Sequence, residues 1–387
     1  MPAKNKLNLK DVLFCAGDYR TKLVKITDYY IGGLVCALFR LRYKQVDFQK
    51  DKVSKILIIR PGGIGDAVLL IPFLKEIRSI FIGAKIDILA EKRNVEVFRL
   101  ASDLFDEMFC YDSANFISIF MDLKMRNYDL VFDTEQWHNF SAILSYYICS
   151  KIRVGFATRP NRARFYTNSA NYSQRDYEVD SFINLLGPWL LNRDKRRAEA
   201  PFLTLSDELI SWARSFIPLN CNSVALSLSA SIKQRIWSVN KLQALTNYLI
   251  RRNYKVIFLG GAKEIKLFNA ILKGVIKKEG ILDFVNKINL SQVAVLMSVS
   301  KFYFGSDSGI LHIAYGLAVP SICLFGSGNI DKWAPPGNQH ITISMNLLCS
   351  PCTLFGYTPD CRDVKCMEEI KVEDVIAAIE RLEKIIQ

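Results

Sequence analysis

The sequence lacks several patterns that would define its class at once. Its apolar run at residues 31–39 has nine residues, whereas a membrane-spanning helix needs roughly 20. It has no D-x-D pair, so a two-carboxylate metal site on one short loop is not expected. It also has no G-x-S-x-G or H-E-x-x-H motif, and no RNP-like aromatic strand or basic DNA-reading helix. These absences disfavour a membrane-spanning protein, a serine hydrolase, a zinc protease and a nucleic-acid-binding protein.

The chain is poor in histidine but rich in positive charge. It has 3 His among 387 residues, and 51 Lys and Arg against 38 Asp and Glu give a net charge of +13. Its 50% of hydrophobic residues exclude a disordered or low-complexity chain. The length accommodates two domains with separate cores. The basic excess implies an acidic partner, which could be nucleic acid, an anionic membrane surface or a phosphorylated ligand.

Nearly half of that excess lies in the first fifty residues, which carry ten Lys and Arg against four Asp. They include the apolar run, preceded by Tyr29 and Tyr30. A cleavable signal peptide would place its apolar segment nearer the start and follow it with small residues, so none is expected. The segment is either a basic, aromatic-rich element lying on an anionic membrane surface or a helix packed on the next domain. The sequence leaves both interpretations open.

Cysteine usage indicates a reducing compartment. Six of the ten cysteines are scattered, mostly in apolar surroundings, which is typical of reduced buried thiols, so a cytoplasmic location is expected. The other four cluster near the end of the chain, at Cys349, Cys352, Cys361 and Cys366. Only the first pair has zinc-knuckle spacing. A zinc site is therefore one interpretation, and reduced or redox-labile thiols packing a small loop are the other.

Apolar runs and helical patterns alternate along two stretches of the chain. We expect strands at residues 55–59, 86–90, 130–133, 223–228, 255–259, 301–304 and 320–324. We expect helices at residues 67–80, 179–191, 239–252 and 372–386. This alternation predicts parallel sheets with crossover helices, and the charged stretch 192–207 contains the expected linker.

The predicted fold class is therefore α/β, with two Rossmann-like domains. Residues 1–50 would form a basic amphipathic extension, 51–200 the first domain, 201–370 the second domain and 371–387 a C-terminal helix. Ligands of open α/β sheets bind outside the carboxyl ends of the strands. We therefore expect the site in a central cleft where the strand ends of the two domains face each other.

The segment Arg60–Asp66 (RPGGIGD) is the first candidate site. It follows a strand and opens a helix, where backbone N–H groups and the helix dipole favour an anion. Gly63 and Gly65 let a substrate approach the backbone closely. The segment matches neither G-x-G-x-x-G nor a Walker A loop. Asp66 could act as a general base, or it could only cap the helix.

Phosphate-binding chemistry recurs in two loops of the second half. In FGSDSGILH, Ser308 and Gly309 with the free N–H groups of a helix would cradle a phosphate, and His312 lies one turn on. A capped helix with a satisfied histidine is the alternative. In GGAKE, Glu264 follows a Gly-Gly turn and suits ribose hydroxyls.

A third loop, SLSASIKQRIW, combines hydroxyls and cations after a strand. The hydroxyls belong to Ser229 and Ser231, and the cations to Lys233 and Arg235. This combination suits a pyrophosphate.

Together these segments resemble glycosyltransferase family 9, the ADP-heptose:lipopolysaccharide heptosyltransferases. The similarity runs from about Lys55 to Val375 and leaves out the first fifty residues. It rests on ILIIRPGGIGDAVLLIPFLKEIR, YDLVFDTEQ…RVGF, SASIKQRIWSVNKL, FGSDSGILHIAYGLAVPSICLFG and CSPC…C…CM. The resemblance implies a GT-B fold and inverting transfer from a nucleotide-activated sugar, without a metal, a cofactor or a covalent intermediate.

The resemblance also implies roles for single residues. Asp66 would deprotonate the acceptor hydroxyl, and Arg235 would neutralise the leaving diphosphate. Asp307 would position the turn or the sugar, and Met297 would line the base pocket. The expected donor-binding set is Gly63, Gly65, Ser229, Ser231, Lys233, Glu264, Met297, Asp307, Ser308, Gly309 and His312.

The expected reaction is transfer of a heptose from ADP-heptose to a lipopolysaccharide core or related surface glycan. The expected partners are the nucleotide sugar, a lipid-linked glycan acceptor and an anionic membrane surface at the cytoplasmic face of the inner membrane, and not nucleic acid. One alternative is a GT-B transferase with another nucleotide sugar and acceptor. Another is a non-catalytic scaffold that binds nucleotide sugars.

Overall fold

The computed structural model describes residues 19–38, 52–112, 114–148, 150–189, 199–230 and 232–387. Its described residues form two compact units. The N-terminal unit contains those up to Glu199 together with Leu354–Tyr357, and the C-terminal unit contains Ala200–Thr353 and Thr358–Gln387. None of the helices in these ranges is long and apolar enough to cross a membrane.

The N-terminal unit is built on a six-stranded parallel sheet with the order β3-β2-β1-β4-β5-β6. Its strands are β1 (Lys55–Arg60), β2 (Lys85–Glu91), β3 (Glu107–Tyr111), β4 (Leu130–Asp133), β5 (Ile152–Phe156) and β6 (Asn168–Ala170). The central strands β1 and β4 are apolar on both faces and almost wholly buried, because helices cover both faces of a parallel sheet.

The helices of this unit follow the expected crossover pattern. They are α4 (Ile64–Ile80), α5 (Val95–Arg99), α6 (Phe116–Met125), α7 (Asn139–Tyr147), α8 (Pro160–Ala163) and α9 (Glu178–Asn184), with short turns at Ser102–Leu104 and Gly187–Trp189. The expected helix at 179–191 is thus shorter, because Gly187 and Pro188 interrupt it.

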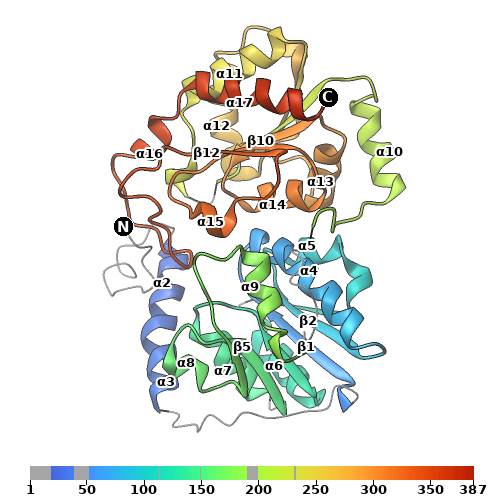
Figure 1. The fold of residues 1–387 in the computed structure, drawn as a ribbon, viewed down its shortest axis with the longest axis vertical. Helices are drawn as coiled ribbons and strands as arrows, with labels where there is room; N and C mark the ends of the chain where they lie inside the picture. Colours follow the sequence, from blue (N-terminus) through green and yellow to red (C-terminus); the bar gives the residue numbers. More distant parts are fainter. Residues whose placement is uncertain (1–18, 39–51, 113, 149, 190–198, 231) are drawn as a thin grey trace. The chain divides into compact units, whose positions relative to one another are not determined.

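A further helix precedes the sheet. It consists of α2 (Tyr19–Thr27), a π-helical turn η1 (Asp28–Gly32) and α3 (Gly33–Leu38), and it runs beside α7 and α8 (Figure 1). Asp28 accepts hydrogen bonds from the backbone N–H groups of Asn139 and Phe140, and Cys36 is buried against Ala142. This part of the first fifty residues is therefore a helix packed on the N-terminal unit, and the rest lies outside the described residues.

The C-terminal unit has a second six-stranded parallel sheet, with the order β12-β11-β10-β7-β8-β9. Its strands are β7 (Ser223–Ser227), β8 (Lys255–Leu259), β9 (Ile281–Asp283), β10 (Phe302–Ser306), β11 (Ser321–Leu324) and β12 (His340–Ile343). Its longer helices are α10 (Asp207–Phe216), α11 (Val239–Arg251), α12 (Ile265–Leu272), α13 (Leu290–Ser298), α14 (Gly309–Gly316) and α17 (Val372–Ile385). Short helices lie at Lys233–Arg235 (η5), Ala262–Glu264 (η6), Lys278–Gly280 (η7), Ile330–Trp333 (α15) and Lys365–Glu368 (α16).

The last helix belongs to the core of this unit. Helix α17 lies beside α11 (Figure 1), and its residues Val375, Ile379 and Leu382 are buried in the main apolar cluster. The predicted α/β class with two Rossmann-like domains is confirmed.

Each sheet has a topological switch point at its centre. The strand order reverses between β1 and β4 in the first sheet and between β7 and β10 in the second. Ligands of doubly wound sheets bind at the carboxyl ends of the strands beside such a switch point. The two loops that follow β1 and β4, and the two that follow β7 and β10, are therefore the places where functional side chains are expected.

Candidate functional site

Asp66 lies at the switch point of the N-terminal unit. The turn after β1 needs glycine at Gly62, whose φ of +111° is unfavourable for other residues. Gly63 is the N-cap of α4, and Gly65 and Asp66 stand in its first turn. The Asp66 side chain is 24% exposed, so a substrate hydroxyl can reach it.

Gln136 connects Asp66 to a second carboxylate. The Gln136 Nε2 group donates to Asp66 Oδ1 at 2.9 Å and to Glu178 Oε1 at 2.6 Å. Glu178 is buried, and its other oxygen accepts from the Tyr172 hydroxyl at 2.8 Å. Because each amide hydrogen serves one carboxylate, the orientation of both acids is determined by one side chain.

A buried arginine lies beside Asp66 and Glu135. Arg60, at the end of β1, donates to the Thr134 carbonyl at 2.7 Å and to Glu135 Oε2 at 2.9 Å, and its NH1 lies 4.0 Å from Asp66 Oδ1. Burial lowers the pKa of Arg60, but the charges of Asp66 and Glu135 outweigh it and raise the pKa above its usual value. The guanidinium is therefore a permanent positive charge beside Asp66.

Sequence reasoning did not find Gln136, Glu135 or Glu178. The segment DTEQ stands directly after β4, and Asp133 pairs in register with Ile59 of β1. Polar residues after two neighbouring strands of a parallel sheet converge at one edge. That signal could have found Gln136 and Glu135, whereas Glu178 comes from α9 and has no comparable one.

Arg235 and Asp307 form the centre of the second switch point. Arg235 NH1 donates to the Asp307 carbonyl at 2.8 Å, and its NH2 lies 3.1 Å from Asp307 Oδ2. The Arg235 side chain is 14% exposed. A Cβ at Gly328 would lie 2.0 Å from the Asp307 carboxylate, so only glycine fits there. Asp307 therefore holds Arg235 in place, whereas its predicted role toward the turn or the sugar stays a prediction.

The N-terminus of α14 opens beside this pair. Ser308 is its N-cap, and its side chain makes no capping hydrogen bond in the described structure; Gly309 begins the helix, while His312 is buried one turn on. Arg235 Nε and Ser327 Oγ are buried and have no hydrogen-bond partner among the described residues. Buried polar groups are usually paired, so these two atoms are available to hydrogen-bond a polar or anionic ligand.

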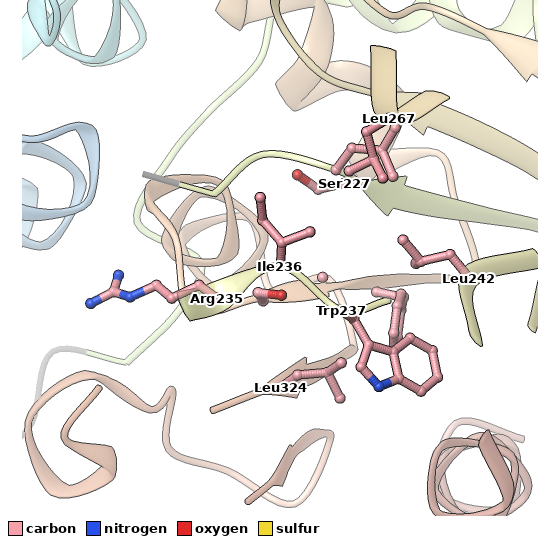
Figure 2. Close-up of a pocket in the computed structure, with 11 residues that line it drawn as sticks. Ser227, Arg235, Ile236, Trp237, Leu242, Leu267 and Leu324 are labelled. Carbon is pink, nitrogen blue, oxygen red and sulfur yellow. The ribbon is translucent and has the colours of Figure 1, made fainter. Parts of the chain in front are cut away.

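A pocket adjoins Arg235 at the same edge of the sheet (Figure 2). Arg235 extends away from the apolar side chains of Trp237 and Leu242 (Figure 2). The pocket is lined by Ser227, Leu228, Arg235, Ile236, Trp237, Leu242, Leu267, Phe304, Gly305, Ser306 and Leu324. Its polar and charged members come from the loops after β7 and from the end of β10, as the switch-point rule predicts.

The remaining predicted donor residues are placed less uniformly. Ser229 donates its backbone N–H to Ser227 Oγ at 3.2 Å, and Lys233 pairs with Asp360 at 2.9 Å. Glu264 accepts from the N–H of Gly261 at 2.7 Å. Of the other residues predicted to bind the sugar donor, Met297 is fully buried in α13, and Ser231 lies outside the described residues.

The four late cysteines are free thiols near one another. Burial, followed by the neighbouring Cys366, Cys349 and Cys361, raises the pKa of Cys352 to about 11. Within the part of the chain that the structure describes, no three His, Cys, Asp or Glu side chains are arranged to hold a metal ion.

Comparisons with known proteins agree with the geometry. The family model "Glycosyltransferase family 9 (heptosyltransferase)" matches residues 116–356. A lipopolysaccharide heptosyltransferase 3 of Escherichia coli is 24% identical over 341 residues, covering 82% of this chain and 96% of the relative.

Two solved structures share the fold. A family 9 glycosyltransferase of Veillonella parvula has a TM-score of 0.73 at 19% identity, covering 88% of this chain and 99% of the other. The E. coli ADP-heptose lipopolysaccharide heptosyltransferase II has a TM-score of 0.69 at 18% identity, covering 86% and 98%.

Two Rossmann-like domains, each with a polar site at its switch point, make up a GT-B fold. The chain belongs to glycosyltransferase family 9. The predictions of the family, the fold and glycosyltransferase activity are thereby confirmed.

Proposed function

We propose that this chain is an inverting heptosyltransferase that takes its sugar from ADP-heptose and adds it to a lipopolysaccharide core or a related surface glycan. The names of its relatives support this donor and acceptor. The main support is the Arg235–Asp307 pair beside the N-terminus of α14. Two buried polar atoms there, Arg235 Nε and Ser327 Oγ, have no hydrogen-bond partner among the described residues. This is the chemistry that a nucleoside diphosphate needs.

The donor diphosphate would bind the C-terminal unit. Arg235 and the N–H groups at Ser308 and Gly309 would stabilise the negative charge that grows on the departing phosphate. Ser327 Oγ and Arg235 Nε would find their missing partners in phosphate oxygens. A cation with preset geometry and a helix dipole then perform the task for which other transferases use a divalent metal.

The acceptor would react at the N-terminal unit. Asp66 takes the proton of the acceptor hydroxyl, and the hydroxyl oxygen attacks the anomeric carbon of the heptose. The new bond forms on the face opposite the diphosphate, the bond between that carbon and the phosphate oxygen breaks, and ADP leaves. The configuration is inverted, and no covalent enzyme intermediate forms. Gln136 keeps Asp66 directed toward the hydroxyl.

Two measurements test the proposed reaction. Among ADP-, UDP- and GDP-sugars, ADP-heptose should bind most tightly, and a preference for another donor would overturn the heptose assignment. Asp66→Asn should abolish transfer while ADP binding persists, whereas the exposed Asp103→Asn, in the same unit, should behave as wild type. Transfer that survives Asp66→Asn would refute the base.

A chelation experiment tests whether transfer needs a divalent metal ion. We expect transfer to continue after chelation with EDTA, because Arg235 and α14 supply the positive charge. Activity that disappears with EDTA and returns with a divalent cation would contradict the metal-free mechanism.

We further propose that the enzyme works at the cytoplasmic face of the inner membrane. A lipid-linked acceptor is embedded in that surface, and the first fifty residues carry ten Lys and Arg against four Asp. Basic segments are attracted to the anionic lipids of such a leaflet.

A further inference from the structure

The helix that precedes the first sheet exposes several large apolar side chains on its outer side. We call the residues Tyr19–Leu38, which comprise α2, η1 and α3, the N-terminal helix. Its exposed large apolar residues and their exposed fractions are Leu23 (51%), Val24 (69%), Tyr30 (47%), Ile31 (60%), Leu34 (60%) and Leu38 (69%).

The spacing of these residues places them on one face. They recur after one, six, one, three and four positions, which follows the period of a helix. The opposite face carries Ile26, Tyr29 and Cys36 and packs on the N-terminal unit. The helix is therefore apolar on two sides, and packing among the residues that the structure describes buries only one of them.

Neighbouring helices of the same unit also expose apolar side chains. Phe140 of α7 is 43% exposed, its backbone N–H binds Asp28, and its ring lies 5.7 Å from that of Phe120 in α6. Apart from Ile82, every exposed large apolar residue described in the N-terminal unit lies on the N-terminal helix, α6 or α7; on the latter two these are Phe116, Ile117, Met121, Met125, Phe140 and Tyr147. Exposed apolar side chains gathered on a few neighbouring helices are typical of an interaction site.

Charge identifies the partner. Asp28 is the one acidic residue of the N-terminal helix, and it is directed inward, where it binds Asn139 and lies 3.4 Å from His138. The outer side therefore carries no carboxylate. Lys25 is also directed inward, because it donates to the Gly356 carbonyl and lies over the Tyr357 ring. The basic excess that attracts an anionic surface is that of the first fifty residues as a whole, ten Lys and Arg against four Asp. Two copies of this basic segment would repel each other, whereas an anionic lipid surface attracts it.

We propose that the N-terminal helix lies in the plane of a bilayer that contains anionic lipid, with Val24, Ile31, Leu34 and Leu38 inserted between the headgroups. An interfacial helix combines such an apolar face with basic residues. Its biological setting rests on the proposed action on a lipid-linked acceptor, but the docking itself requires no transfer. The membrane contact that the sequence left open would thus be made by the outer face of the N-terminal helix.

Flotation of the full-length protein with vesicles tests this assignment. Vesicles of phosphatidylcholine mixed with phosphatidylglycerol are compared with vesicles of phosphatidylcholine alone. The double variant Ile31→Gln/Leu34→Gln removes two exposed apolar side chains, and Ile82→Gln is the matched control, 89% exposed in the same unit but away from this surface. We expect the double variant to bind anionic vesicles about 30-fold more weakly and Ile82→Gln to bind as wild type does.

The outcomes separate the proposal from its rivals. Wild-type binding should require anionic lipid and weaken as salt is added. The proposal is overturned if the wild type ignores vesicles, if the double variant binds them equally well, or if light scattering shows a dimer that this variant abolishes while vesicle binding persists.

Transfer to a delipidated glycan acceptor separates this proposal from the proposed function. We expect the double variant to retain that transfer, because the helix face does not contact Asp66. A double variant that loses transfer along with vesicle binding would overturn the assignment of this face to docking alone. Vesicle binding by a wild type that transfers no sugar would sustain the docking and overturn the function.

Discussion

A substitution of Gln136 tests how the carboxylate of Asp66, the proposed general base, is positioned. The Gln136 Nε2 group lies 2.9 Å from Asp66 Oδ1 and 2.6 Å from Glu178 Oε1. The substitution Gln136→Leu keeps the approximate volume of the side chain but removes both donors. Asp66 can then rotate away from the acceptor hydroxyl, and Glu178 loses a hydrogen-bond partner in a buried place.

The size of the effect follows from these two contacts. A hydrogen bond to a charged group contributes about 1.5–3 kcal/mol. Loss of that amount in the transition state lowers kcat by roughly 10- to 150-fold, since about 1.4 kcal/mol corresponds to a factor of ten. The free energy of unfolding should fall by a similar amount through Glu178.

The assay separates positioning from general damage. Transfer from ADP-heptose gives kcat and KM, and calorimetry gives the affinity for ADP, which binds the other unit in the proposed mechanism. We expect a lower kcat with unchanged ADP affinity. Thr158→Val is the matched control. The Thr158 hydroxyl donates to the backbone carbonyl of Gln136 at 2.6 Å, so this variant removes a hydrogen bond to the same residue but leaves its side-chain amide intact.

A second variant tests the chemical reason. Gln136→Glu preserves the length of the side chain but offers no N–H group and adds a third carboxylate. It should lose at least as much activity as Gln136→Leu. Full activity in either variant, or a parallel loss of ADP affinity, would refute the positioning role.

Three further predictions concern stability. Burial lowers the pKa of His138, but Asp28 and Glu135 outweigh burial and raise this pKa above 6.5. Protonated His138 therefore stabilises the fold fully below pH 6.5, and this stabilisation is lost as the pH rises through the raised pKa. His138→Gln should accordingly flatten the decline of Tm toward alkaline pH. Burial lowers the pKa of His340 to about 4, so the fold loses stability as the pH falls from 6.5 toward 4, and His340→Gln should reduce that loss; an unchanged Tm profile would contradict either assignment. Arg162→Met should lower the free energy of unfolding by about 3–5 kcal/mol in urea titrations, because it leaves the buried Asp133 carboxylate without its partner at 2.9 Å; a change below about 1 kcal/mol would show that Asp133 does not depend on this pair.

The strands that the sequence predicted are those with continuous apolar runs. β1, β4 and β8 lie inside their sheets, and almost all of their side chains are buried. The sequence missed β5, which lies inside the first sheet and is interrupted by Arg153 and Gly155. It also missed the short edge strand β6. The edge strands β3, β9 and β12 were missed because each is only half-buried and mixes polar with apolar residues. Such strands have no clear period of their own and are formed by pairing with a neighbour.

The candidate site divides in the same way. Asp66, Arg235 and Ser308 follow strands in compact local motifs, so their residue types and spacing were enough to single them out. Gln136 meets Asp66 across 70 positions of sequence and Glu178 across 42. No local pattern records those contacts. Likewise, the pairing of Asp307 with Arg235 is visible only once β7 and β10 stand side by side.

The sequence by itself determined the alternation of strands and helices, the glycine turn with its carboxylate and the loops that we propose bind phosphate, because each depends on residues close together in the chain. The tertiary structure decided which of those residues meet, since strand order brings distant loops to one sheet edge. It also decided the two faces of the N-terminal helix. The basic, apolar segment could have been a packed helix or a membrane-surface element, and its inner face is packed while its outer face remains apolar and exposed.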